Sequence, residues 1–450
     1  MDIQGIIIGI LQLLASLSIL VGLHELGHLL AAKYFGVKVE KFSIGFPPKI
    51  FGFKYGETEY CLSAIPLGGY VKIAGMIDES LDTEQMSKDP EPWEFRTKPA
   101  WQRLIIMLGG IIFNVILGVL IMIAIAFTYG EKYIPIEEVN KYGIEVNDLG
   151  RSIGLETGDK IININGEKPK AFKDLLDPSF ILNDDSYYTI ERNGEQKKID
   201  ITSEFLQKYS SSDLKDEEKR FITIREDKYS FAIGAVAPDR NAGKAGLKSK
   251  DKVVKVNETT ITDFASFQKM LHQNAGKELS FVVERDGKTI TLPVSVAADS
   301  TIGVGIAYDI DYVERPYTFV ESLKVGTETA FGVIGVQAKA YKKMAKGDIN
   351  ASDSLSGPIG MVMIFGTEFE AYRFWRITGF LSMVLALMNL LPIPALDGGH
   401  VMFLLYEMIT GRPPSDKFLE IAQKVGMVLI LCLMIFIFGN DIWKLIKANL

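Results

Sequence analysis

Residues 3–28 read IQGIIIGILQLLASLSILVGLHELGH, and this stretch decides the fold class. Ile3–Leu23 holds 21 residues without a charge, which is enough to cross a bilayer at the rise of an α-helix. Two histidines and a glutamate follow at once, in His24-Glu25-Leu26-Gly27-His28. Ionisable side chains at the end of an apolar span are costly, so their presence indicates a functional site in a membrane protein.

Three further uncharged runs extend this interpretation. They are Leu104–Gly130, Ile377–Leu396 and Val425–Asn440, with 27, 20 and 16 residues. With 48% hydrophobic residues and a mean hydropathy of +0.16, the 450-residue chain is too apolar for an ordinary soluble protein. We predict a polytopic α-helical membrane protein with four transmembrane helices. The first run lacks a basic start and a small-residue cleavage site, so we expect it to be a retained span.

Charge and cysteine content exclude other classes of protein. A net charge of -7 gives no electrostatic reason to expect nucleic-acid binding. The two cysteines, Cys61 and Cys432, lie far apart in the sequence and suggest neither a disulfide framework nor a cysteine metal site. The loop between the first two runs, residues 33–103, holds ten Lys or Arg residues, which weakly favours a cytoplasmic location for that loop.

The long polar stretch between the second and third runs contains an internal repeat. Ile153–Asn165 aligns with Ala245–Asn257 at an offset of 92 residues, and Ile190–Gly194 aligns with Val283–Gly287 at an offset of 93. The latter pair ends in Asn-Gly and Asp-Gly, the dipeptides typical of type I′ turns in β-hairpins. We predict two related α+β modules outside the membrane.

A separate β region is predicted between the first two spans, within Phe42–Ile73. Its expected strands are Lys49–Lys54, Glu59–Ala64 and Tyr70–Ile73, separated by Gly and Pro residues. A β-hairpin without a special role is the simpler alternative. The other interpretation is a membrane-associated β-sheet whose edge binds an extended peptide by strand addition.

The two histidines in the first span have the spacing of metal ligands. Residues i and i+4 of a helix face the same way, so His24 and His28 can hold one ion with Glu25 beside it. The chain has only four histidines, which makes a chance match improbable. The alternative is a polar cluster that is satisfied at the membrane interface.

A catalytic zinc ion usually has three protein ligands and one open position for water. Asp397 ends the third apolar run, and spans one and three run parallel in a four-span topology, so Asp397 is expected at the depth of His24 and His28. His400 lies close by and His272 lies in the second module, and neither is preferred as the third ligand.

These motifs give the chain a clear resemblance to the site-2 protease family of intramembrane zinc metalloproteases, and most of all to its bacterial regulator-of-sigma-E branch. The matching elements are His24–His28, Asn389-Leu-Leu-Pro-Ile-Pro-Ala-Leu-Asp397-Gly398, Pro66–Lys72 and Ser356–Gly360. The resemblance extends over essentially the whole chain. It implies a Zn²⁺ ion held by His24, His28 and Asp397, with Glu25 as the general base.

The resemblance also implies a biological setting. The repeated modules would be PDZ-like domains facing the periplasm, binding peptide or protein segments, in a multi-pass protein of the bacterial inner membrane. The substrates would be single-span membrane proteins in the lipid bilayer, such as anti-sigma factors, or remnant signal peptides. A bound peptide bond would be cut in or near the substrate's transmembrane segment.

Four further residues are candidates for substrate binding or for stabilising the oxyanion: Asn389, Asn114, Gly68 and Gly69. Asn389 and Asn114 could equally form interhelical hydrogen bonds, and for Asn114 we favour the structural role. The second span reads Gly109-Gly110-Ile111-Ile-Phe-Asn114 where relatives often have G-P-x-x-N, so the usual proline is absent. Neither module shows a G-L-G-F-type carboxylate loop, and the modules could instead act as a steric gate.

Two other functions compete with the protease. A catalytically silent membrane scaffold would have no need for Glu25 beside two histidines at metal-ligand spacing. A zinc transporter would need polar residues along the second and fourth spans, which offer almost none. The expected divisions are 1–35, 104–130, 373–400 and 425–445 for the four spans, 36–103 for the β loop, 131–235 and 236–312 for the modules, 313–372 for interfacial or connecting helices, and 401–424 for a loop.

Overall fold

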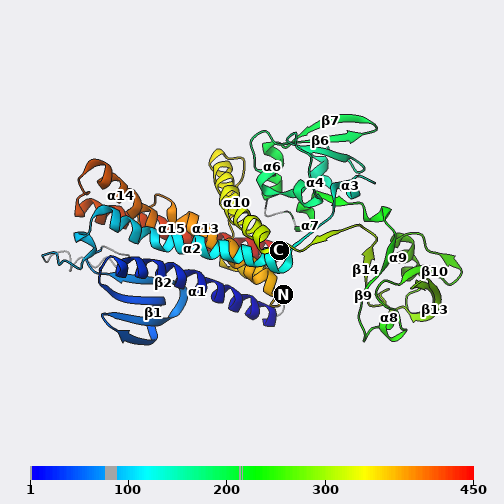
Figure 1. Cartoon of the computed structure of the whole chain (residues 1–450). Coiled ribbons are helices and arrows are strands. Elements are labelled where there is room, and N and C mark those ends of the chain that lie inside the picture. The colour runs from blue at the N-terminus through cyan, green and yellow to red at the C-terminus, as the bar shows by residue number, and fades with distance from the viewer. Residues whose placement is uncertain (1–2, 77–88, 212–213, 215, 450) are drawn as a thin grey trace. The chain divides into compact units, whose positions relative to one another are not determined.

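The computed structural model describes residues 3–76, 89–211, 214 and 216–449. The chain separates into two compact units (Figure 1). The helical unit consists mainly of Met1–Glu131 and Arg315–Leu450, and the repeat unit of Lys132–Tyr209 and Asp213–Glu314. The internal repeat therefore lies in a separately packed part of the chain, between the second and third apolar runs.

Long helices build the helical unit. They are α1 (Ile3–Tyr34), α2 (Ala100–Tyr129), α10 (Phe319–Lys346), α13 (Ala371–Leu390), α14 (Asp397–Thr410) and α15 (Asp416–Asn449), with the short η2 (Phe95–Thr97), α11 (Ala351–Ser354) and α12 (Pro358–Phe365) between them. Among the described residues, three helices are long and apolar enough to cross a membrane, and they lie at Ile3–Tyr34, Ala100–Tyr129 and Lys417–Lys447.

The third predicted span, 373–400, is not one helix. α13 ends at Leu390, an irregular segment follows, and Asp397 is the first residue of α14. Pro392 and Pro394 explain the break, because proline has no N–H to donate and disfavours helical geometry in the residue before it. The predicted loop 401–424 is also wrong, since α14 continues to Thr410 and α15 begins at Asp416.

α10 packs against the apolar helices. A side chain at Gly326 would lie 2.5 Å from the backbone of Ile123 in α2, so the two helices approach closely at this point. Ala330 is fully buried in a cluster with Met122 of α2 and Met383 of α13. The expected helices in 313–372 are present, and the longest of them is part of the helix bundle.

The β region forms a curved antiparallel sheet from β1 (Val39–Tyr55) and β2 (Thr58–Ile73). Each strand folds back on itself, since Phe42 pairs with both Val71 and Tyr60, and Tyr60 also pairs with Phe53. Across the sheet, the extended segments therefore follow the order 69–73, 39–44, 58–65 and 49–55. The strand at 39–44 was not predicted from the sequence. Among the described residues, no other strand pairs with 69–73, which is an edge of the sheet.

The first module of the repeat unit contains short elements. They are α3 (Ile136–Val139), β4 (Ile144–Val146), α4 (Asp148–Arg151), β5 (Lys160–Ile164), η3 (Phe172–Leu176), α5 (Pro178–Ile181), β6 (Tyr187–Arg192), β7 (Glu195–Asp200), α6 (Ser203–Ser210), α7 (Asp216–Lys219), β8 (Ile222–Ile224) and η4 (Glu226–Lys228). Its sheets have the orders β5-β6-β7 and β4-β8, and the strands β3 (Glu131–Tyr133) and β15 (Val313–Arg315) pair where the chain enters and leaves the unit.

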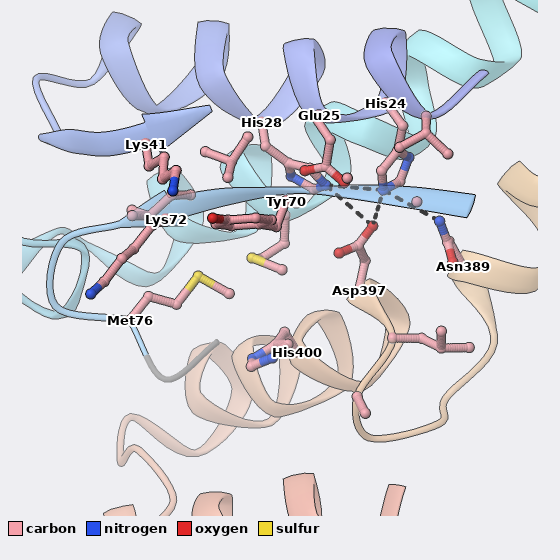
Figure 2. Close-up of a pocket in the computed structure, with 18 of the residues that line it drawn as sticks. His24, Glu25, His28, Lys41, Tyr70, Lys72, Met76, Asn389, Asp397 and His400 are labelled. Carbon is pink, nitrogen blue, oxygen red and sulfur yellow. Dashed lines mark hydrogen bonds and ion pairs between the residues drawn. The ribbon is translucent and has the colours of Figure 1, made fainter. Parts of the chain in front are cut away.

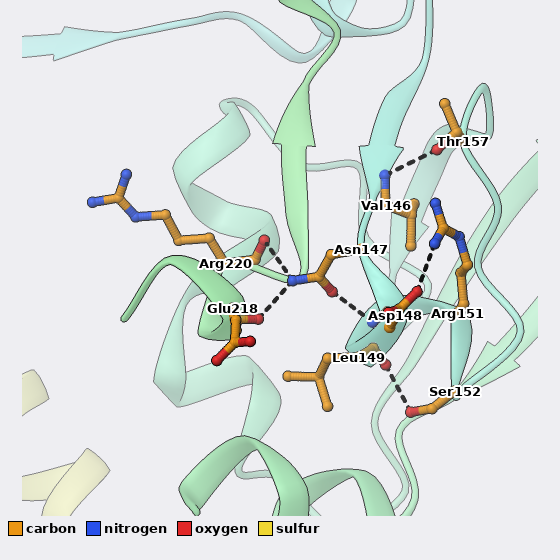
Figure 3. Close-up of polar contacts among 10 residues, drawn as sticks. Val146, Asn147, Asp148, Leu149, Arg151, Ser152, Thr157, Glu218 and Arg220 are labelled. Atoms are coloured by element: carbon orange, nitrogen blue, oxygen red, sulfur yellow. Dashed lines mark hydrogen bonds and ion pairs between the residues drawn. The ribbon is translucent and has the colours of Figure 1, made fainter. Parts of the chain in front are cut away.

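Asn147 joins distant parts of the first module (Figure 3). Its Oδ1 accepts a hydrogen bond from the Gly150 N–H at the start of α4, which caps that short helix. Its Nδ2 donates to the carbonyls of Glu218 and Arg220, in the segment that leads into β8. One side chain thus holds β4, α4 and β8 in register.

The second module is built from β9 (Phe231–Val236), α8 (Asn241–Lys244), β10 (Lys252–Val256), β11 (Thr259–Thr260), α9 (Phe264–Gln273), β12 (Glu278–Arg285), β13 (Lys288–Ser295) and β14 (Val304–Tyr308). The predicted boundary at 235/236 divides β9 and is wrong. β9 pairs with β14, and Phe231 and Ile233 belong to the core of the second module.

The predicted hairpin turns are confirmed. Asn193-Gly194 joins β6 to β7 and Asp286-Gly287 joins β12 to β13, and all four residues have positive φ. A type I′ turn requires positive φ at both central residues, which explains the two dipeptides.

Candidate metal centre

One helix, α1, and the start of another, α14, bring three potential metal ligands together (Figure 2). The Nε2 atoms of His24 and His28, one turn apart on α1, lie 3.2 Å from each other. Asp397 Oδ2 lies 3.1 Å from His24 Nε2 and 3.3 Å from His28 Nε2. These residues form the group of potential metal ligands found among the described residues. The three residues that the sequence selected are therefore adjacent in space.

The hydrogen bonding of His28 and Asp397 fits a cation among these atoms. His28 Nδ1 lies 2.8 Å from the carbonyl oxygen of Ile106, which can only accept, so the neutral ring has its proton on Nδ1 and its lone pair on Nε2. Asp397 Oδ2 is buried and receives no hydrogen bond. Acceptor atoms that face one another without a proton between them repel, and a divalent cation removes that repulsion.

Asn114 fixes the ring of His24. Its Nδ2 lies 3.1 Å from His24 Nδ1, and its Oδ1 is buried without a hydrogen-bond partner among the described residues. The amide orientation that satisfies Oδ1 has this oxygen accepting from Nδ1–H, which leaves the His24 Nε2 lone pair for a metal. Asn114 is thus more than an interhelical contact, because it supports a candidate ligand directly.

Glycines allow α1 and α2 to meet at the cluster. A side chain at Gly109 would lie 2.6 Å from the carbonyl oxygen of Gly27, and one at Gly110 would overlap the rings of His24 and His28. The close packing here requires residues without a Cβ. In the sequence, these positions were marked only by the Gly109-Gly110 pair, where this chain matches the family pattern in part.

The cluster lines a cavity of about 810 Å³. Glu25 lies in its wall next to the histidines, and Asn389 Nδ2 lies 3.3 Å from His24 Nε2 (Figure 2). Asn389 therefore reaches the site, as a role in binding the substrate or the oxyanion requires. His400 also lines the cavity but is not part of the three-residue cluster.

The edge segment 69–73 of the sheet forms another wall of the cavity. Gly69 packs against Val21 and Glu25 of α1, and a Cβ at Gly69 would lie 2.8 Å from Val21 and 3.2 Å from Glu25. Gly68 is packed under the ring of Phe46. Both glycines thus bring backbone close to the site. Tyr70 and Lys72 also line the cavity, and sequence reasoning had assigned them no role.

Comparison with known proteins identifies the family. The sequence model of peptidase family M50 matches residues 12–433. The chain belongs to peptidase family M50. It is 30% identical to the regulator of sigma E protease of Haemophilus influenzae, over 96% of this chain and 97% of that protein, and 27% identical to the Escherichia coli protein of that name, over 96% and 98%.

A third relative bears on the metal. The chain is 28% identical to a Neisseria meningitidis protein provisionally named a zinc metalloprotease, over 97% of this chain and 99% of that protein. The expected resemblance to the site-2 protease family is confirmed, and the protein is a zinc metalloprotease.

Proposed function

We propose that His24, His28 and Asp397 bind the catalytic zinc ion and that Glu25 is the general base, in a protease that cuts membrane-embedded substrates. The observation that carries the proposal is the three-residue cluster, which combines two helical histidines with a carboxylate whose Oδ2 is buried and has no hydrogen-bond donor among the described residues. Zinc held there would lower the pKa of a water molecule and polarise the peptide carbonyl. Glu25 would then take a proton from the attacking water and deliver it to the leaving amine.

Other groups at or near the cavity would position the substrate and the two histidines. Asn389 Nδ2 is close enough to His24 to donate to the substrate carbonyl as negative charge develops on it. Asn114 and the Ile106 carbonyl hold the two imidazoles with Nε2 towards the cavity. Gly68 and Gly69 would contribute to substrate binding through their backbone, which borders the cavity next to Glu25.

The substrate is proposed to bind as an added strand along segment 69–73. A peptide bond inside a helix is protected, because its carbonyl is already hydrogen-bonded, so the substrate has to be held extended. Of the strands expected from the sequence, Glu59–Ala64 pairs with extended segments on both sides and offers no free edge, whereas 69–73 pairs on one side only.

The edge can be tested with single proline substitutions from Gly69 to Lys72. Successive N–H groups of a strand point to opposite sides, so proline removes an outward donor at every second position only. We expect cleavage to fall in this alternating pattern. Equal cleavage by all variants, or an equal loss at every position, would contradict strand addition.

We further propose the setting that the relatives suggest. The chain would be an inner-membrane protein with four spans, α1, α2, α13 and α15, and with the modules of the repeat unit as periplasmic PDZ-like domains. Its substrates would be single-span membrane proteins such as anti-sigma factors, or remnant signal peptides. The relatives named for regulation of sigma E support the anti-sigma-factor type of substrate.

The test of the proposed function uses the purified full-length protein in detergent with a single-span test substrate. Wild type should cut, a chelator should stop cleavage, and added zinc should restore it. Glu25→Gln should keep one zinc per chain but cut about 10²–10⁴-fold more slowly, the usual size of a general base effect. Wild-type protein that binds no zinc would contradict the proposed metal site.

A further inference from the structure

The carbonyl of Pro394 makes an unusually close contact with the last helix of the chain. Asp397 follows the irregular segment Leu391–Leu396, which we term the Pro loop. Gly426 of α15 is buried, and a Cβ built on it would overlap the carbonyl oxygen and carbon of Pro394. Glycine leaves the space that this carbonyl occupies, so the two backbones can meet here.

The Pro loop has little internal support of its own. Pro392 and Pro394 cannot donate backbone hydrogen bonds, and Ala395 has a φ of +78°, a conformation that L-residues rarely adopt. The loop's internal backbone hydrogen bonds run from the Ile393 N–H to the Leu391 carbonyl and from the Leu396 N–H to the Ile393 carbonyl. Such a segment keeps its shape only when its neighbours hold it.

Three glycines hold the Pro loop from two sides. On the α14 side, a Cβ at Gly399 would lie 2.6 Å from the Ile393 oxygen, and one at Gly398 would overlap the Leu391 oxygen. On the α15 side, Gly426 provides the contact with Pro394. Gly398 belongs to the recognised Asp-Gly motif, whereas Gly426 lies outside every motif in the sequence.

α15 contacts the rest of the helical unit at few places, so the contact between Gly426 and Pro394 is important for where α15 and the Pro loop meet. Only 11% of its most apolar window is buried. Gln423, one turn before Gly426, is 4% exposed and lines the cavity that contains His24, His28 and Asp397. The face of α15 that bears Gly426 is therefore directed at the site.

We infer that Gly426 is a positioning residue, which sets the place of Asp397 through the carbonyl of Pro394. Any side chain at 426 has to push the Pro loop away from α15. Asp397 lies three residues further along and would shift relative to the histidines, which stay in place on the uninterrupted helix α1. The zinc site would then lose one of its three ligands without a change to any ligand residue. The inference rests on the proposed metal site.

The test compares Gly426→Ala with Gly439→Ala in the purified full-length protein. Gly439 lies on the same helix, and a Cβ there would have no neighbour within 4 Å, so both variants carry the same chemical change. Zinc affinity is measured by competition with a chelator, and kcat and KM are measured at limiting and at saturating zinc. We expect Gly426→Ala to bind zinc about 10–100-fold more weakly, the usual effect of disturbing a ligand's support, and to regain kcat as zinc is raised.

Gly439→Ala should match wild type in every measurement. Wild-type zinc affinity in Gly426→Ala would overturn the inference and leave the proposed metal site intact, whereas a wild type without zinc would reject the metal site itself. If Gly426→Ala does not fold, the double variant Gly426→Ala with Ala395→Gly carries the test, because glycine at 395 lets the Pro loop adapt. Zinc affinity equal to that of Ala395→Gly alone would then overturn the inference.

Discussion

Carboxylates with a buried oxygen atom occur in both units of the molecule, and their neighbours differ in kind. In the helical unit, Asp397 Oδ2 faces the Nε2 atoms of two histidines and receives no hydrogen bond. In the repeat unit, Asp159 and Asp251 are 1% and 0% exposed, and each accepts two hydrogen bonds from an arginine.

The difference distinguishes the proposed metal site from a structural ion pair. Burial of a charge is costly unless the charge is paired. The two aspartates of the repeat unit are paired with arginines, so their burial needs no metal ion. Asp397 Oδ2 instead faces the Nε2 atoms of two histidines, and the proposed zinc ion would complete its surroundings. The arginines, Arg192 and Arg285, occupy equivalent positions in the two modules, which shows that the repeat preserves the pair.

The largest effect is expected at Asp397. In Asp397→Asn, the amide can donate to a histidine Nε2, so the metal-free protein should be at least as stable as wild type. Zinc should be lost and cleavage should fall by about 10³-fold or more, because the Lewis acid supplies several kcal/mol of transition-state stabilisation. Zinc content, cleavage of a single-span substrate and thermal unfolding with chelator present measure these effects. A lower unfolding temperature in chelator would show that Asp397 is structural.

The opposite result is expected at Arg285. Arg285→Leu leaves Asp251 buried without its partner, which should destabilise the second module by about 3 kcal/mol. Zinc binding should not change. Amide hydrogen exchange in β10 and β12 is the measurement, and Arg151→Leu is the control, because Arg151 forms an exposed pair with Asp148 worth less than about 1 kcal/mol. Equal exchange in the two variants would contradict the structural role of the buried pair.

A smaller effect on zinc is expected at Asn114. Asn114→Leu removes the acceptor for His24 Nδ1–H and should weaken zinc binding about 10–100-fold. Asn114→Asp keeps an acceptor oxygen in the same place and should retain more of the affinity. A chelator competition measures both variants. If Asn114→Leu binds zinc as wild type does, the residue serves only the packing of α1 on α2.

The sequence predicted those parts of the site that depend on local geometry. His24 and His28 lie on one helix, so their spacing alone fixes that they face the same way. The Asn-Gly and Asp-Gly turns were predictable for the same reason, since the required positive φ is a local property.

The parts that sequence reasoning missed depend on contacts between distant segments. The third span was extended through Asp397 because its apolar run continues past Leu390, although the prolines within it end the helix. The strand at 39–44 and the assignment of β9 to the second module depend on pairing with partners far along the chain. Gly426 carries no signal at all, because its role comes from a single carbonyl 32 positions earlier in the chain.

The smallest predicted effect is the pH dependence of the second module. Burial alone would raise the pKa of Asp251, but hydrogen bonds from the Arg285 guanidinium and the Lys248 N–H hold it below its ordinary value. The unfolded chain then binds more protons than the folded one, so this contribution is present above pH of about 4 and is lost as the pH falls through the folded pKa.

Without the arginine the sign reverses. In Arg285→Leu, burial raises the pKa of Asp251, and protonation of the carboxyl relieves the unpaired charge. The destabilisation caused by Arg285→Leu should therefore be largest near pH 7 and shrink as the pH falls below about 4. Hydrogen exchange in β10 and β12 at several pH values, corrected for intrinsic exchange rates, measures the difference between variant and wild type. A difference that is constant with pH would mean that Arg285 stabilises the module by packing, and that the charge of Asp251 is not what it compensates.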